Sequence, residues 1–231
     1  MNTGPTDPQW PRLLSLSVHE FRTPVTVVAG YIRMLLKDRA GTLNDQQRRL
    51  LEEAEKSCAR LSSLLVEMSD LSNLEAGTGT FNRKSVDLEG LLKDAIAALP
   101  DLPDRSVQVE LSTDGARGGA IDGDPVRLRQ AFTSVLNAVR REIVTSDRLF
   151  VRQRPRRHDG LTVSWIAFGD ADHIDALEAA EPASLQTFDE WRGGCGLSLA
   201  VARRIVAAHD GAIWSSAPDA RTGAVVMLPA S

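Results

Sequence analysis

This sequence is poor in cysteine and in aromatic residues, and it has no long apolar run. Its 231 residues include 2 cysteines and 1 tyrosine, and aromatic residues make up 5% of the chain. The two cysteines, Cys58 and Cys195, lie far apart, so the sequence indicates a reduced, cytoplasmic setting rather than a disulfide framework. No apolar run approaches the roughly 20 residues of a membrane span, and residues 1–8 have neither region of a signal peptide. We therefore expect a cytoplasmic chain without a membrane span.

The chain also lacks a strong charge of one sign. Its 27 Lys and Arg residues against 31 Asp and Glu give a net charge of −4, so no general attraction to nucleic acid is expected. A basic run at residues 152–157 is interpreted as a solvated hairpin tip, because no aromatic residues are interleaved with it. With 42% hydrophobic residues, the chain has the material for one large or two small domains.

The N-terminal third predicts two long amphipathic helices that follow a flexible tail, residues 1–12. In the first, apolar residues recur at intervals of three and four, namely Val18, Phe21, Val25, Val28, Ile32 and Leu35. This helix should end near Gly41. The second should begin after Asn44, which forms a capping box with Gln47, and its apolar seam reads Leu51, Ala54, Cys58, Leu61, Leu65 and Met68.

Two helices joined by a short loop make an antiparallel hairpin, which cannot cover both seams alone. Pairing of two hairpins into a four-helix bundle would cover them, so we predict a homodimer. The alternative is a monomeric hairpin that packs on the rest of the chain.

A glycine-rich breaker at residues 77–79 indicates a domain boundary. After it, helical patterns cover residues 86–99, 124–143 and 198–209. Strand patterns cover residues 107–112, 149–153, 161–168, 212–215 and 224–228. This mixture predicts an α+β protein in which the hairpin is followed by an α/β sandwich.

The stretch Ser17-Val18-His19-Glu20-Phe21-Arg22-Thr23-Pro24 carries the strongest chemical signal. On a helix, His19 and Thr23 share a face, and Pro24 should kink the helix just after the histidine. Neutral imidazole is a nucleophile, and a neighbouring carboxylate can take the proton from its other nitrogen. A surface histidine with a chance neighbour is the alternative for an isolated His-Glu pair. The whole stretch resembles the phospho-accepting H-box of bacterial two-component sensor histidine kinases. The resemblance implies that His19 is phosphorylated, that Glu20 is its base, and that Thr23 positions water for dephosphorylation of a regulator.

A second motif, Gly194-Cys195-Gly196-Leu197-Ser198-Leu199, precedes a helix. Glycines at such a place let backbone N–H groups approach phosphate. The stretch resembles the G2 box of the kinase ATP-binding domain, although Ser198 replaces its third glycine, and the resemblance assigns Gly194 and Gly196 to ATP. At the end of the following helix, we interpret His209 as a C-terminal cap favourable to the helix dipole rather than a ligand.

The helix at residues 124–143 resembles the N-box of the same domain. The resemblance makes Asn137 a ligand of Mg²⁺, for which an amide oxygen is suitable, and makes Arg140 a cation that touches phosphate. Asn137, however, lies one residue closer to Asp124 than usual, which is about 100° of helix rotation. The alignment therefore needs a local deletion, and a purely local role for Asn137 stays open.

The G1 box, Asp-x-Gly-x-Gly in the family, is degenerate here. Strand residues 162–168 run into Gly169-Asp170-Ala171-Asp172-His173, where both glycines of the motif are missing. Asp170 could still contact adenine, or Asp172 could simply be the N-cap of a short helix at residues 173–180. The usual aromatic residues of the following segment are also missing, although Phe188 and Trp191 could fill their space.

The resemblance implies a phospho-acceptor and dimerisation domain at residues 13–77 and an ATP-binding domain at residues 78–231. We expect autophosphorylation of His19 from Mg·ATP and transfer to an aspartate in the receiver domain of a response regulator, with input from a separate sensor protein. The alternative is an impaired phosphotransfer or phosphatase hub whose nucleotide domain no longer binds ATP. A gyrase- or chaperone-like ATPase shares only the second domain and has no need of the H-box hairpin.

Overall fold

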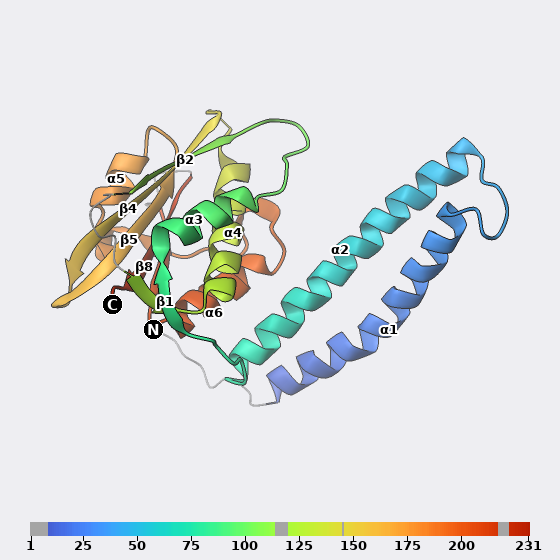
Figure 1. Cartoon of the computed structure of the whole chain (residues 1–231), viewed down its shortest axis with the longest axis horizontal. Coiled ribbons are helices and arrows are strands. Elements are labelled where there is room, and N and C mark those ends of the chain that lie inside the picture. The colour runs from blue at the N-terminus through green and yellow to red at the C-terminus, as the bar shows by residue number, and fades with distance from the viewer. Residues whose placement is uncertain (1–8, 114–119, 145, 217–221) are drawn as a thin grey trace. The chain divides into compact units, whose positions relative to one another are not determined.

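The protein is described by a computed structural model that covers residues 9–113, 120–144, 146–216 and 222–231. It divides into two compact units, Met1–Gly79 and Thr80–Ser231 (Figure 1). Within the described residues, no helix has both the length and the hydropathy that crossing a membrane requires.

The first unit is a hairpin of α1 (Trp10–Leu36) and α2 (Asp45–Glu75). The capping box predicted at the start of α2 is confirmed. The Asn44 side chain accepts the Gln47 N–H at 2.9 Å, and the Gln47 side chain accepts the Asn44 N–H at 3.0 Å. Of the expected tail, residues 1–8 lie outside the described residues, but residues 10–12 already belong to α1, so that expectation was wrong for them.

The predicted end of the first helix was also wrong. The left-handed residue is Asp38, with φ 55°, and α1 ends at Leu36 rather than near Gly41. The Asp38 carboxylate accepts the Leu43 N–H at 3.3 Å and pairs with Arg48 at 2.9 Å. Arg48 also donates to the Leu36 carbonyl at 3.0 Å. The helix can therefore end before Asp38, because Arg48 of α2 donates a hydrogen bond to a carbonyl group in the last turn of α1 that would otherwise have no partner in the helix.

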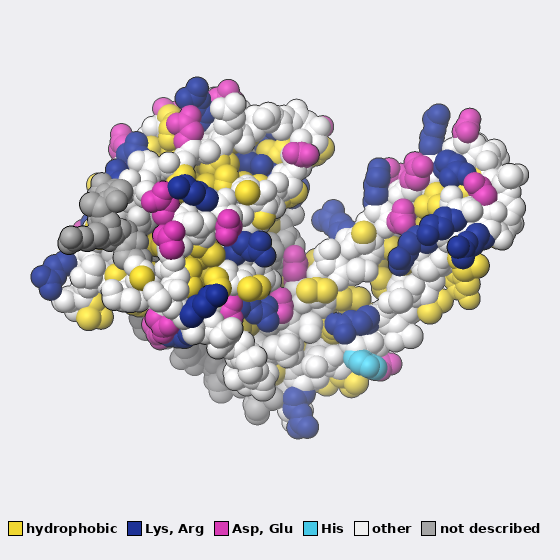
Figure 2. All heavy atoms as spheres, viewed as in Figure 1, with side chains coloured by type: hydrophobic (Ala, Val, Ile, Leu, Met, Phe, Trp, Pro, Cys, Tyr) yellow, Lys and Arg dark blue, Asp and Glu magenta, His cyan; other side chains and the backbone are white. Residues whose placement is uncertain are grey.

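The apolar seams are only partly buried within one hairpin. The residues buried in it are Leu14, Val18, Ala29 and Ile32 of α1 and Cys58, Leu65 and Ser72 of α2. Three of the predicted seam residues stay open to solvent, with exposed fractions of 57% for Phe21, 48% for Val28 and 49% for Leu61. Apolar side chains gather on the surface of the hairpin in Figure 2. This unit therefore has an uncovered apolar stripe.

The second unit contains two sheets. A two-stranded sheet pairs β1 (Lys84–Asp87) with β3 (Ala120–Gly123). The larger sheet has the order β2-β4-β5-β8-β7-β6. Its strands are β2 (Gln108–Thr113), β4 (Arg148–His158), β5 (Leu161–Gly169), β6 (Gln186–Thr187), β7 (Ala212–Ser215) and β8 (Ala224–Pro229). Only the β2–β4 pair is parallel among these.

Helices cover both faces of the large sheet (Figure 1). The helices α3 (Leu88–Ala97), α4 (Pro125–Glu142) and α6 (Ser198–Ala208) lie on one face, where Phe168 of β5 meets Phe132 of α4 at 6.4 Å between ring centroids. The short helix α5 (Ile174–Ala179) lies on the other, where Trp165 donates its indole N–H to the Leu177 carbonyl at 3.0 Å. Because neighbouring strand residues point to opposite faces, β5 is buried on both sides. The α+β prediction, a helical pair followed by a mixed α/β domain, is confirmed.

The basic run is not the solvated hairpin tip that the sequence suggested. The strand β4 runs through it to His158, and the turn follows at Asp159 and Gly160. Arg152, Arg154 and Arg156 form ion pairs with acidic residues in and after α5, namely Asp175, Glu178 and Glu181. Burial raises the pKa of Glu178, but its bonds to Arg152 and Arg154 outweigh this and leave the pKa below its usual value. The run therefore attaches α5 to the sheet.

Candidate functional site

One candidate site is the exposed face of α1 in the first unit. Val18 is 3% exposed, and the next residue, His19, has a side chain that is 78% exposed. Figure 2 shows one histidine at the surface of the hairpin beside an acidic side chain. The sequence-based expectation that His19 lies beside the buried stripe and within reach of solvent is confirmed.

The side chains of His19 and Glu20 lie within hydrogen-bond distance of each other. The Nδ1 atom of His19 lies 3.4 Å from Oε1 of Glu20. If Nδ1 carries the proton, the Nε2 lone pair is left to attack an electrophile. Thr23 is also exposed and lies one helical turn further along. The arrangement can therefore provide a nucleophile and a base on an open helix surface.

A separate candidate site is built on α4 in the second unit. The Asp124 side chain caps this helix by accepting the N–H groups of Val126 and Arg127 at 3.0 and 3.1 Å. It also accepts the Asn82 N–H at 2.9 Å. Burial raises the pKa of Asp124, but these three donors outweigh it and leave the pKa below its usual value. The carboxylate is thus held ionised where the helix dipole favours negative charge.

His209, the residue that follows α6, forms a hydrogen bond with the start of α4. Its Nε2 accepts the Asp124 N–H at 2.9 Å, so the ring proton is on Nδ1, which donates to the Ile205 carbonyl at 2.7 Å. The residue is 3% exposed, and this burial lowers the pKa of His209. The prediction that His209 is a C-terminal cap is confirmed, because it is the C-cap residue of α6 and its Nδ1–H donates to a carbonyl of the last turn.

Asn137 lies beside the glycine-rich segment, as its proposed role requires. Its amide nitrogen is 3.9 Å from Sγ of Cys195. The flanking Gly194 and Gly196 have φ of 59° and 65°, which glycine adopts readily. However, α4 is one uninterrupted helix, so the one-residue displacement of Asn137 is not absorbed by a break. Ala138 instead packs against the segment, where a Cβ on Gly193 would lie 3.1 Å from its Cα.

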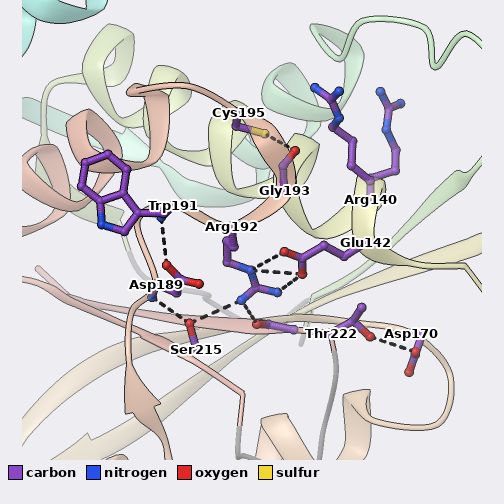
Figure 3. A network of polar contacts seen from close by, with 12 residues as sticks. Arg140, Glu142, Asp170, Asp189, Trp191, Arg192, Gly193, Cys195, Ser215 and Thr222 are labelled. Carbon is purple, nitrogen blue, oxygen red and sulfur yellow. Dashed lines mark hydrogen bonds and ion pairs between the residues drawn. The ribbon is translucent and has the colours of Figure 1, made fainter.

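Arg140 does not join this group. It is 7% exposed, and its guanidinium donates to the Pro100 carbonyl in the loop after α3. Its Nε has no partner among the described residues. Burial lowers the pKa of Arg140. In Figure 3 it lies apart from the other polar residues of the site, so the expected phosphate contact is not prepared in this structure.

Asp170 is buried at the end of β5, with both carboxylate oxygens occupied. Oδ1 accepts the His173 N–H at 3.1 Å and lies 2.7 Å from Nδ1 of the same histidine. Oδ2 accepts the Thr222 hydroxyl at 3.1 Å. Burial raises the pKa of Asp170, but the bonds from His173 and Thr222 outweigh it and lower the pKa. Asp170, and not Asp172, therefore holds the start of the short helix α5.

A polar network around Arg192 was not predicted from the sequence. The Arg192 guanidinium donates to the Glu142 carboxylate at 2.9 and 3.1 Å and to the Gly223 carbonyl at 2.6 Å. It also reaches the Ser215 hydroxyl at 3.4 Å. Figure 3 shows this network next to the pair of Thr222 and Asp170. No local sequence signal could have found it, because its members come from distant parts of the chain.

The two aromatic residues expected to fill the segment after α5 differ in position. Phe188 is 4% exposed and belongs to the core, whereas Trp191 is 75% exposed. Only Phe188 therefore fills space in the domain. Neither cysteine forms a disulfide; Cys58 is buried and Cys195 is half-buried.

The donors around Asn137 bear on metal binding. Within the described ranges, no group of three or more His, Cys, Asp or Glu side chains could hold a metal ion. A hard cation at this place would take the Asn137 amide oxygen and draw its other ligands from phosphate and water, which is the usual way that proteins bind Mg²⁺.

Comparisons with known proteins agree on one family. A family model for the "His Kinase A (phospho-acceptor) domain" matches residues 12–77. The "Sensor protein GacS" of Pseudomonas syringae pv. syringae is 30% identical over 203 residues, which are 84% of this chain and 22% of that protein. The "Phosphate regulon sensor protein PhoR" of Pseudomonas aeruginosa is 30% identical over 200 residues, 83% of this chain and 43% of that protein. The chain thus spans less than half the length of these two relatives.

A solved structure supports the fold of both units. The crystal structure of full-length ShkA in complex with AMPPNP matches 95% of this chain and 45% of that chain, with a TM-score of 0.65 and 24% identity.

Proposed function

Because the chain belongs to the two-component sensor histidine kinase family, we propose that it autophosphorylates His19 from Mg·ATP. It then passes the phosphoryl group to an aspartate in the receiver domain of a response regulator. The carrying observation is the exposed His19 with Nδ1 held 3.4 Å from the Glu20 carboxylate. Residues 13–77 would be the phospho-acceptor and dimerisation domain and residues 78–231 the ATP-binding domain.

The reaction follows from the chemistry of the imidazole. The Nε2 lone pair of His19 forms a bond to the γ-phosphorus, the bond from that phosphorus to the bridging oxygen breaks, and ADP leaves. The Nδ1 proton moves to Glu20, which keeps the phosphorylated ring neutral. Thr23, on the same helix face, is proposed to position water when the regulator is dephosphorylated.

Nucleotide binding is proposed for the second unit. The support is the fold shared with ShkA, whose structure holds AMPPNP, and the position of Asn137 next to Gly194 and Gly196. Asn137 would supply the protein ligand to Mg²⁺, which neutralises charge on the transferred phosphoryl group when bound. Asp170 would face the adenine, provided that the base displaces His173 from its carboxylate.

Assembly is proposed from the uncovered apolar stripe of the hairpin. Trp10, Leu13, Leu16, Tyr31 and Met34 of α1 are exposed together with Phe21 and Val28. Pairing of two hairpins into a four-helix bundle would cover these residues. We therefore propose a homodimer that docks the receiver domain and takes its signal from a separate sensor protein.

A specific observation favours a second candidate function. Both oxygens of Asp170 are engaged within the protein, and Arg140 is directed to the Pro100 loop. A domain with these features fits an impaired phosphotransfer or phosphatase hub, which would keep His19, Glu20 and Thr23 and would not bind ATP.

The test is incubation of the full chain with γ-labelled ATP and Mg²⁺. Wild type should acquire acid-labile, base-stable label. His19→Gln and Asn137→Ala should abolish it, whereas the control variant His158→Gln should label like wild type. Absence of label, together with absence of ATP binding by calorimetry, would reject the kinase and leave the hub.

A further inference from the structure

Residues 189–195, which run into the glycine-rich motif, are anchored by one buried arginine. Arg192 has a side chain only 9% exposed, and its Glu142 partner is 21% exposed. Its three acceptors belong to three elements: Glu142 ends α4, Ser215 ends β7, and Gly223 directly precedes β8 (Figure 3). Ser215 also accepts the Asp189 N–H at 3.0 Å, so the anchor involves the start of the segment as well as its middle.

The anchor lies within the candidate nucleotide site. Gly193, next to Arg192, packs on Ala138 of α4, and Cys195 lies beside Asn137. On the other side, Gly223 follows Thr222, whose hydroxyl holds Asp170. The guanidinium therefore lies between the residues assigned to the phosphates and the residue assigned to the base.

The position of Arg192 matters because its guanidinium is positively charged. A triphosphate needs cations, but Arg140 is directed to the Pro100 loop. Arg203 and Arg204 of α6 pair instead with Glu190. Arg192 holds a carboxylate through two N–H groups, and a guanidinium binds phosphate by the same bidentate geometry. A phosphate can thus replace Glu142 without a change in the bonding of the arginine.

We propose that the Glu142–Arg192 ion pair is a latch that competes with the phosphates of the nucleotide. In the nucleotide-free domain, Glu142 occupies the guanidinium and holds residues 189–195 against α4. A nucleoside triphosphate binds by displacing Glu142 and pairing with Arg192. This inference rests on the proposed function. It adds two determinants of the affinity of the domain for a nucleoside triphosphate, because Glu142 weakens binding and Arg192 strengthens it.

Two substitutions at the same ion pair test this, because they should have opposite effects. The affinity of the full chain for Mg·ATP is measured by calorimetry. Glu142→Gln should bind roughly tenfold more tightly, since the competing charge is gone. Arg192→Gln should bind roughly tenfold more weakly, since a charge-assisted contact is lost. Adenosine, which has no phosphate, should bind all forms alike.

The matched control is Asp189→Asn. Asp189 is in the same segment, and its carboxylate accepts the Trp191 N–H at 2.9 Å, which the amide oxygen of Asn can also accept. We expect an ATP affinity close to that of wild type. Equal tightening by Asp189→Asn and Glu142→Gln would overturn the latch, because removal of any negative charge from this region would then explain both. Thermal unfolding without nucleotide establishes that each variant is folded. Arg192→Lys keeps the positive charge and should weaken ATP binding less than Arg192→Gln does.

Failure of the latch and failure of the proposed function give different results. If wild type binds ATP and labels His19, but Glu142→Gln and Arg192→Gln shift the affinity in the same direction or not at all, only the latch is rejected. If no form binds ATP, Glu142→Gln included, both are rejected.

Discussion

Replacement of His209 should strongly lower the free energy of unfolding of the second unit. The ring is 3% exposed, accepts the Asp124 N–H at 2.9 Å and donates to the Ile205 carbonyl at 2.7 Å. It also packs edge-on against Phe81, with 5.2 Å between ring centroids. It therefore joins the end of α6 to the start of α4, the helix that carries Asn137.

The magnitude follows from these contacts. In His209→Ala, the buried Asp124 N–H loses its acceptor, which costs about 1–3 kcal/mol, and the bond to Ile205 adds about 1 kcal/mol. The cavity left beside Phe81 adds to this loss. We expect a total decrease of about 3–5 kcal/mol in the free energy of unfolding, a large part of the roughly 5–15 kcal/mol of an ordinary domain. His209→Gln can keep one donor and one acceptor and should cost less.

The same residue gives a pH dependence. Burial lowers the pKa of His209 in the folded state, so the unfolded chain binds its proton first as the pH falls. The stabilisation is complete above the unfolded pKa of about 6.5 and is lost progressively as the pH falls below it toward the folded pKa. Asp124 and Asp170, whose pKa values are lowered, add a further loss of stability only below about pH 4.

The assay is urea unfolding of the full chain, followed by the fluorescence of the stacked pair Trp165 and Trp214. His158→Ala is the control, because its side chain is 33% exposed and its loss should cost less than about 0.5 kcal/mol. Wild type and His158→Ala should lose stability between about pH 6.5 and 5, and both His209 variants should lose less. A cost below about 1 kcal/mol for His209→Ala, or an unchanged pH slope, would refute the assignment of a neutral structural histidine.

Two further predictions concern contacts outside the candidate nucleotide site. Glu178→Ala should lower the unfolding free energy by about 1–2 kcal/mol, because Arg152 and Arg154 lose a partly buried partner. Asp159→Asn in the nearby turn is the control for the same urea titration, because it removes a charge and keeps a side chain that tolerates the φ of 47°; an equal effect of both would contradict the role of the ion pairs. Val28→Glu should weaken self-association by placing a charge on the exposed apolar stripe, whereas Lys37→Glu should not. Sedimentation at several concentrations measures this, and an unchanged dimer would show that the stripe is not the interface.

The sequence correctly predicted the helices and strands that are defined by their own residues. The capping box at Asn44 and the apolar repeats placed both helices of the hairpin, and strand β7 has the bounds that its pattern predicted. The strands β1, β3 and β6 were not predicted, because strands this short are defined by their partners rather than by their own residues. The same reason explains the basic run, which became strand because β5 pairs with it along its length.

The sequence by itself determined the placement of the proposed phospho-acceptor group, because His19, Glu20 and Thr23 lie within one helical turn and a half and their geometry follows from the helix alone. Only the tertiary structure decided the arrangement of the second site. Thr222 reaches Asp170 across 52 residues, and Arg192 reaches Glu142 across 50. It also decided that Arg140 donates to the Pro100 carbonyl and that Nε2 of His209 accepts the Asp124 N–H. Burial and the direction of a side chain depend on what packs against it, and that information is spread over the whole domain rather than carried by any one motif.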